Sequence, residues 1–348
     1  MSPISSETPA PGWPGIEPRW TSSAKTGVGT ALNQASRVWF TLSHGIFDEI
    51  YYPREDQACI RDMGLIVTSG MDFFSEEKRQ TEQKIETLAP GVPAYKLTNT
   101  CLDGRYRIEK EILTDPKRDV VLQRTQFSAL QGKLEDYRIY VELAPHLANA
   151  GANNTAWVGD YKGTPMLFAE RRGTALALAC SAPWLNRSAG FVGTSDGWQD
   201  LNQHRQMTWT YTRAENGNVA LTGEVDLRQS RGSFIFALGF GDNHFEAGQR
   251  ALASLLDGFE SARSTYIHEW ENWLQTLLPL NATRYAQGTL DLFKMSAAVM
   301  RIHESKRFPG ALIASFSIPW GFSKGDDDLG GYHLSWPRDL VEWPNRVD

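Results

Sequence analysis

Apolar and polar residues alternate along much of the first 240 residues of the chain. In residues 106–113 and 137–143, apolar side chains recur at a two-residue spacing among charged ones. This pattern is typical of antiparallel strands that bury one face. Comparable short runs, bounded by turn residues, occur at 37–42, 46–52, 62–68, 120–127, 166–169, 175–179, 207–211, 219–221 and 234–240. About a dozen strands predict a large antiparallel β-sandwich, which we place at residues 36–241.

The first 35 residues differ from this pattern, because Pro, Gly, Ser and Thr dominate them. We expect residues 1–35 to form a loosely ordered N-terminal arm. The arm has neither the basic nor the apolar segment of a secretory signal, and we expect a cytoplasmic protein. No apolar run approaches the roughly 20 residues that span a bilayer, so no membrane partner is expected.

The period of the apolar residues changes after residue 241. Leu252, Leu255, Phe259, Tyr266, Trp270 and Leu274 recur at helical spacing, interrupted near Gly258 and ended by Pro279. This pattern predicts a helical linker over residues 242–282. A second helix, expected to begin near Thr283, has apolar residues at Leu292, Met295, Val299 and Ile302. Residues 283–348 are therefore predicted to begin a helical domain.

Length and composition limit the function classes. The chain has 348 residues, of which 41% are hydrophobic and 22% are charged, with a net charge of −6. These values predict a folded chain of two domains, or of one large domain and part of another. Nucleic-acid binding needs clustered Lys and Arg side chains, and the sequence has no such cluster. No nucleic-acid partner is expected.

The residues that often bind metals are scattered. Cys59, Cys101 and Cys180 form no CxxC pair, so we interpret them as buried small apolar residues. The acidic run 326–328 lacks the spacing of a calcium loop and is interpreted as a solvated loop. Residues 51–54 combine aromatic and charged side chains, and we expect them to hold a strand end or a domain interface. No metal and no cofactor are expected.

Two stretches near the C-terminus carry the candidate chemistry, namely residues 310–321 and 330–342. They combine glycines, aromatic side chains and an Arg338–Asp339 pair. Trp320, Tyr332 and Trp336 could lie against the apolar face of a pyranose, while forked charged groups bind hydroxyls. A structural alternative is that Arg338 and Asp339 only stabilise a helix start after Pro337. Because the aromatic residues follow a Gly-Gly pair, we favour a sugar pocket.

These stretches give the chain a resemblance to a known family. The sequence resembles the bacterial and archaeal glucoamylase and glucodextranase group, glycoside hydrolase family 15. The resemblance covers nearly the whole chain and is carried by residues 38–40, 45–54, 56, 60–62, 143–149, 195–200, 314–315, 317–321 and 331–339. It implies an N-terminal β super-sandwich, a helical linker and the start of an (α/α)6 barrel.

The resemblance also implies an activity and a set of site residues. The family releases glucose from the non-reducing ends of α-glucans with inversion, so an α-glucan or maltooligosaccharide is the expected substrate. Arg338 and Asp339 would bind the hydroxyls at the 4- and 6-positions of the terminal glucose. Trp336 would form a wall of the pocket, and Tyr332 would face the ring oxygen. Trp320 is a weaker candidate.

The catalytic residues are expected elsewhere. Inversion needs a general acid and a general base roughly 6.5–9.5 Å apart, and in the family both glutamates lie later in the barrel. We therefore expect no catalytic residue within this chain and little or no activity from it alone. The end of the chain departs from the family, since Pro344 would interrupt the helix expected after Glu342, and we suspect a truncated or frame-shifted product.

Three alternatives remain open from the sequence. The first is an inverting glycoside phosphorylase, and the second is a carbohydrate-binding module without catalysis. The third is a hydrolase of the same family that acts on trehalose or dextran. The sequence leaves the oligomeric state undetermined.

Overall fold

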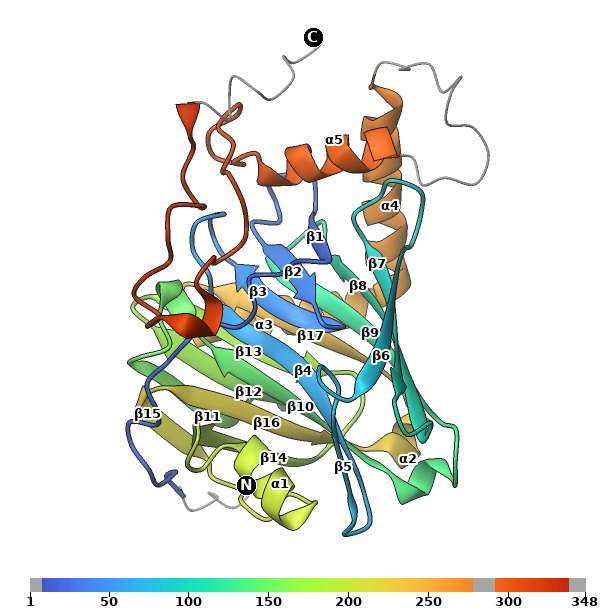
Figure 1. Ribbon diagram of the computed structural model, residues 1–348, viewed down its shortest axis with the longest axis vertical. Helices are drawn as coiled ribbons and strands as arrows, with labels where there is room; N and C mark the ends of the chain where they lie inside the picture. The colour runs from blue at the N-terminus through green and yellow to red at the C-terminus, as the bar shows by residue number, and fades with distance from the viewer. Residues whose placement is uncertain (1–7, 278–291, 338–348) are drawn as a thin grey trace.

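The computed structural model describes residues 8–277 and 292–337, and two antiparallel sheets form its body (Figure 1). The first sheet has the order β1-β2-β3-β4-β10-β16-β14, with β5 paired to β4. Its strands are β1 (Gly27–Thr30), β2 (Trp39–Ser43), β3 (Ile46–Tyr51), β4 (Ile60–Ser69), β5 (Phe73–Glu76), β10 (Arg138–Pro145), β14 (Trp184–Phe191) and β16 (Val219–Val225).

The second sheet has the order β15-β11-β12-β13-β17-β9-β8-β7-β6. Its strands are β6 (Thr81–Thr87), β7 (Tyr95–Cys101), β8 (Tyr106–Thr114), β9 (Val120–Ala129), β11 (Asn154–Tyr161), β12 (Thr164–Arg171), β13 (Thr174–Cys180), β15 (Arg213–Gly217) and β17 (Ser233–Gly241). The sequence prediction of a large antiparallel sandwich followed by helices is confirmed.

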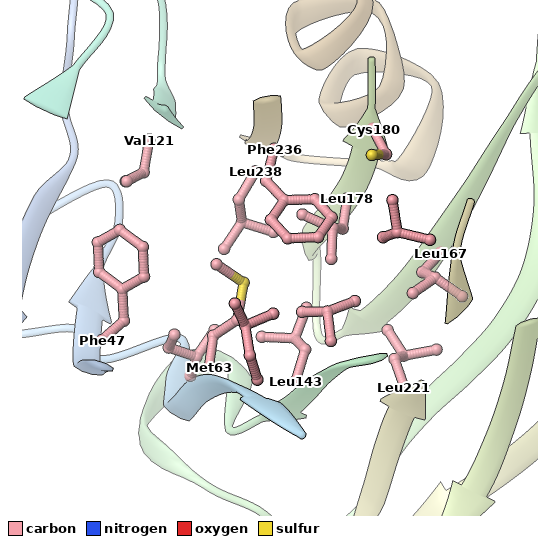
Figure 2. Close-up of a cluster of buried hydrophobic side chains, with 14 of the residues drawn as sticks. Phe47, Met63, Val121, Leu143, Leu167, Leu178, Cys180, Leu221, Phe236 and Leu238 are labelled. Atoms are coloured by element: carbon pink, nitrogen blue, oxygen red, sulfur yellow. The ribbon is translucent and has the colours of Figure 1, made fainter. Parts of the chain in front are cut away.

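The core lies between the two sheets. Leu143 on β10 is paired in register with Met63 on β4, and both side chains are buried. Figure 2 shows side chains of the first sheet meeting those of the second, namely Phe47, Met63, Leu143 and Leu221 with Val121, Leu167, Leu178, Cys180, Phe236 and Leu238. The two-residue spacing of apolar side chains therefore corresponds to the inner faces of the sandwich.

The three cysteines are free and buried, as predicted. Burial raises the pKa of the Cys59 and Cys180 thiols to about 12. The Cys59 thiol lies 3.2 Å from the Tyr52 carbonyl oxygen, to which it donates. These cysteines therefore behave as packing residues.

The N-terminal segment corrects one prediction. Residues 8–35 are not a loosely ordered arm, because they include β1 and a fully buried Trp20. The indole ring of Trp20 lies 4.7 Å from the ring of His146. Its Nε1 donates a hydrogen bond of 3.1 Å to the Asp326 carbonyl oxygen. Burial of one large aromatic side chain fixes a segment whose composition resembles that of a loop.

The strand predicted at residues 207–211 is also wrong. This segment is irregular, and the strand β15 begins later, at Arg213. The backbone N–H groups of Thr208 and Trp209 donate to the Asp200 carboxylate, each at 2.7 Å. A side chain thus takes the place of a neighbouring strand as the hydrogen-bond partner.

Two helices follow the last strand, α3 (His244–Asp257) and α4 (Phe259–Gln275). As the sequence predicts, Gly258 separates them, with φ of 86°. Helix α3 packs on β13 and β17 of the second sheet. A Cβ atom on Gly239 would clash with the Ala247 carbonyl oxygen, so the glycine permits this close approach.

Helix α5 (Leu292–His303) lies across the end of the sandwich beside β1 (Figure 1). Ile302 is buried, whereas Leu292 and Val299 are exposed, so the predicted apolar stripe is covered only in part. The predicted start of this helix near Thr283 lies outside the described residues.

The described residues also form five short helices: η1 (Leu134–Asp136), η2 (Leu147–Asn149), α1 (Gly197–His204), α2 (Leu227–Ser230) and η4 (Gly321–Ser323). None of these described helices is long and apolar enough to cross a membrane.

Candidate functional site

Residues 310–321 and 330–337, which are the described parts of the two stretches that the sequence singled out, lie side by side after α5. The Ala314 N–H donates to the Leu334 carbonyl oxygen at 3.1 Å, and the Ser315 N–H donates to the Tyr332 carbonyl oxygen at 2.9 Å. In Figure 1 this segment descends from α5 along one side of the sandwich and returns. The pairing holds the backbones of the two stretches together.

The inner side of this region is apolar. Phe316 and Ile318 are almost fully buried. The ring of Phe316 lies 5.0 Å from that of Tyr51 on β3 and 4.9 Å from that of His303 on α5. The paired stretches are therefore packed onto both the sandwich and the helix.

The outer side exposes three predicted site residues. Trp320, Tyr332 and Trp336 are exposed by 40%, 45% and 44%, respectively. We call these three side chains the aromatic face. Large aromatic side chains with this exposure offer apolar surface to a ligand.

The indole groups of the aromatic face are fixed by hydrogen bonds. Trp336 Nε1 donates to the Gly331 carbonyl oxygen at 2.8 Å. Trp320 Nε1 donates to the Asp328 carboxylate at 2.8 Å. A Cβ atom on Gly331 would lie 3.2 Å from the Trp336 ring, and one on Gly330 would lie 3.5 Å from Trp320 Nε1. The Gly-Gly pair therefore lies between the two indoles.

One charged side chain covers part of Trp320. Lys324 Nζ lies 4.0 Å from the centroid of the Trp320 ring and 2.8 Å from an Asp328 carboxylate oxygen. The hydrogen bond from Lys324 lowers the pKa of the Asp328 carboxyl. Lys324 therefore covers part of the Trp320 ring face on which a sugar could stack.

Arg338 and Asp339 lie outside the described residues. Their predicted roles toward glucose hydroxyls stay predictions, and the structure relates neither of them to Tyr332 or Trp336.

The acidic run 326–328 was only partly predicted correctly. Asp326 is buried at 9% exposure, so the interpretation as a solvated loop is wrong for this residue. Its carboxylate accepts a hydrogen bond from the Gly151 N–H, and its carbonyl oxygen accepts one from Trp20. Burial raises the pKa of the Asp326 carboxyl. Asp326 therefore connects the loop to the sandwich.

In the part of the chain that the structure describes, no three His, Cys, Asp or Glu residues form a possible metal site.

Sequence reasoning gave no role at the site to Tyr51 or His333. The Tyr51 hydroxyl donates to the Phe316 carbonyl oxygen at 2.7 Å and lies 3.1 Å from His333 Nε2. Burial lowers the pKa of His333 to about 4, so the imidazole is neutral near pH 7. The only sequence signal was the aromatic run 51–54, which we expected to hold a strand end or an interface. Tyr51 does end β3 and contacts the C-terminal segment, and Arg54 and Asp56 form an ion pair at 2.7 Å.

A cavity of about 130 Å³ lies apart from the aromatic face, between β1 and the end of α5. Lys306 at its wall donates to Thr30 Oγ1 at 2.8 Å and to the Ser36 carbonyl oxygen. Burial lowers the pKa of Lys306 to about 7. These contacts join the residues after α5 to the sandwich, and we interpret the cavity as part of that joint. The three side chains of the aromatic face are not among the residues that line this cavity.

Comparison with known proteins agrees with this arrangement. Residues 10–275 match the family model described as glucodextranase, domain N. A glucoamylase of Clostridium sp. (strain G0005) is 39% identical over 332 residues, which are 95% of this chain and 46% of that protein.

Two solved structures also resemble this chain, to different degrees. A bacterial glucoamylase complexed with acarbose matches with a TM-score of 0.92 and 37% identity, over 96% of this chain and 48% of that chain. A glycosyl hydrolase of the GH92 family matches with a TM-score of 0.50 and 10% identity, over 86% of this chain and 42% of that chain, which shows likeness of fold alone. The chain spans about half the length of the glucoamylases that it matches. By sequence and by fold, the chain belongs to the glucoamylase and glucodextranase family of glycoside hydrolases.

Proposed function

We propose that this chain provides the N-terminal sandwich and part of the terminal-glucose pocket of an inverting glucan α-glucosidase. The carrying observation is the pairing of residues 314–315 with residues 332–334, within the segment that exposes the aromatic face. A pyranose has an apolar C–H face, and exposed indole and phenol rings complement it. An α-glucan or maltooligosaccharide is the proposed substrate, and the acarbose complex of a similar glucoamylase supports this class.

We assign roles within the pocket from the family resemblance. Trp336 forms a wall, and Tyr332 faces the ring oxygen, where positive charge develops during cleavage. Arg338 and Asp339 bind the outer hydroxyls of the terminal glucose. The fixed indole of Trp336 supports its assignment, because a wall that is already ordered loses little entropy on binding.

The division into domains is part of the same proposal. Residues 36–241, joined by β1 of the preceding segment, form the sandwich domain, residues 242–282 the linker, and residues 283–348 the start of the catalytic barrel. The general acid and base are assigned to parts of the barrel outside these 348 residues. The chain alone would then bind sugar without cleaving it, because loss of an acid–base pair removes several orders of magnitude in rate.

The test is an acarbose titration of the 348-residue chain, together with an assay of glucose release from maltotetraose. We expect saturable binding, weakened at least about tenfold by Trp336→Ala, and no glucose release. Trp13→Ala is the matched control, because Trp13 is also exposed, at 68%, and its Nε1 also donates to a backbone carbonyl, that of Asn216.

Four outcomes would contradict parts of this proposal. Absence of saturable acarbose binding would exclude the proposed pocket. Equal weakening of acarbose binding by Trp13→Ala would show that the sugar binds elsewhere. Glucose release by the chain itself would place the catalytic carboxylates within these residues. Formation of glucose 1-phosphate from maltotetraose and added inorganic phosphate would instead favour a glycoside phosphorylase.

A further inference from the structure

Strand β3 is buried on both of its faces, although it lies near an end of its sheet. Phe47 and Ile50 belong to the core between the sheets. Tyr51 belongs to a second apolar cluster, which also contains Phe316 and Ile318 of the C-terminal segment. The face of β3 that bears Tyr51 is thus covered by the segment that carries the aromatic face.

The Tyr51 hydroxyl contacts both stretches of that segment at once. It donates its single proton to the Phe316 carbonyl oxygen at 2.7 Å. The contact of 3.1 Å with His333 Nε2 must then run the other way, with Nε2–H donating to the Tyr51 oxygen. This hydrogen bonding assigns the proton of the neutral imidazole to Nε2.

Ring packing supports the same contact. The rings of Tyr51 and His333 lie 5.2 Å apart at 80°, and those of Tyr51 and Phe316 lie 5.0 Å apart at 61°. Tyr51 is fully buried, and His333 is 7% exposed. Edge contacts of this kind hold rings in one orientation.

His333 lies in the sequence between Tyr332 and Leu334, whose carbonyl oxygens accept the two hydrogen bonds that pair the stretches. A shift of His333 would therefore move both of these hydrogen bonds. The same shift would displace the Tyr332 side chain and the Gly331 carbonyl oxygen that holds the Trp336 indole.

Burial, and not the balance of nearby charges, favours a neutral imidazole at this contact. Lys25 opposes protonation of His333, whereas Asp56 favours it, and burial outweighs both. Lys25 is itself held by Asp48 at 3.1 Å and by Glu49 at 2.9 Å.

We propose that Tyr51 and His333 are positioning residues, through which the sandwich sets the geometry of the aromatic face for sugar binding. This inference depends on the proposed function, because it assigns a role toward the same pocket. Neither residue touches the sugar. Each acts through the backbone that carries Tyr332 and Trp336.

The test uses the 348-residue chain labelled with 5-fluorotryptophan, with the resonances of Trp320 and Trp336 assigned from single Trp→Phe variants. Tyr51→Phe removes the hydroxyl and keeps the ring. We expect the Trp336 resonance to shift or broaden, and acarbose binding to weaken about three- to tenfold, as loss of one or two buried hydrogen bonds predicts. Tyr106→Phe is the matched control, because that fully buried tyrosine binds Ser75 Oγ at 2.7 Å within the sandwich.

A pair of substitutions at His333 provides an independent measurement. His333→Gln retains an N–H donor for the Tyr51 oxygen, whereas His333→Leu removes it. We expect affinity and the Trp336 resonance to be near those of the unmodified chain for Gln and clearly altered for Leu. A purely space-filling role would give the same result for both variants and would overturn the proposal.

The two proposals fail in different ways. If the unmodified chain binds no acarbose, the proposed function fails and the role in sugar binding fails with it. If the unmodified chain binds acarbose but Tyr51→Phe changes the resonance and the affinity no more than Tyr106→Phe does, the positioning role alone is overturned.

Discussion

The sandwich and the C-terminal segment of residues 304–337 are stabilised in different ways. Strands of the sandwich satisfy their backbone groups with one another, in ladders that run through each sheet. The C-terminal segment has little regular structure and binds to the rest of the chain. Arg19 donates to the Phe322 carbonyl oxygen at 2.9 Å, and Ser317 Oγ donates to the Ser23 carbonyl oxygen at 2.6 Å.

This difference shows where the shape of the candidate pocket comes from. The residues that would touch sugar lie on a segment held by side chains from the sandwich and from residues 8–35, such as Tyr51 and Trp20. A change deep in the sandwich should lower the stability of the whole body. A change at an anchor should act first on the aromatic face.

The largest expected effect is in the sandwich, at the buried ion pair of Lys110 and Glu77. Their charged atoms lie 2.7 Å apart, and both side chains are at most 1% exposed. Lys110→Met leaves the Glu77 carboxylate buried without its cation, which should lower the free energy of unfolding by roughly 3–5 kcal/mol. Urea unfolding at pH 7 measures this loss.

Two variants control for the ion pair. Lys84→Met removes a cation from an exposed pair with Glu86 and should change stability little. The double variant Lys110→Met/Glu77→Gln removes both buried charges while an amide oxygen still accepts from the Leu65 N–H, and it should recover part of the loss. If Lys110→Met were as stable as Lys84→Met, the idea that the buried pair of Lys110 and Glu77 stabilises the sandwich would be wrong.

The same contrast explains how far the sequence could predict the structure. Alternation along residues 106–113 identified β8 because the strand interior repeats every two residues. Lys110 lies at an inward position of that pattern, yet its partner Glu77 is on another part of the chain and could not be inferred. At residues 207–211 the prediction failed because the Asp200 carboxylate takes the N–H groups that a strand would pair.

At the candidate site, residue types gave more information than periodicity. The glycine pair and the aromatic residues indicated an exposed sugar-type surface, and the structure exposes Trp320, Tyr332 and Trp336. The contact between Tyr51 and His333 joins residues 282 positions apart, which no local pattern reports. Anchors of this kind are visible only in three dimensions.

A smaller effect is expected on acidification, at the anchor itself. The pKa of His333 is lowered from 6.5 to about 4 by burial, so the unfolded chain takes up the proton first as the pH falls. Stability is therefore unaffected by this group above about pH 7 and declines as the pH falls from 6.5 towards 4. The full loss is about 3 kcal/mol, of which about 2 kcal/mol has occurred by pH 5.

The free energy of unfolding at pH 7 and pH 5 tests this dependence. In His333→Gln the difference between the two pH values should shrink by about 2 kcal/mol. The exposed residue His268 gives the control variant His268→Gln, for which the difference should not change. An unchanged pH dependence in His333→Gln would mean that this imidazole does not remain neutral in the folded chain.

The smallest expected effect is at Lys324, which covers part of Trp320 in the aromatic face. Both Lys324 and its partner Asp328 are exposed, so Lys324→Gln should leave urea unfolding unchanged within error. The variant should, however, uncover the Trp320 ring and shift its 5-fluorotryptophan resonance, while the Trp336 resonance stays in place. Lys162→Gln removes a comparable cation from the ring of Tyr161 and should shift neither resonance. If Lys324→Gln shifted the Trp336 resonance as much as the Trp320 resonance, the two indoles would be coupled and the aromatic face would behave as one unit. If it shifted neither resonance, Lys324 would not cover Trp320 in solution.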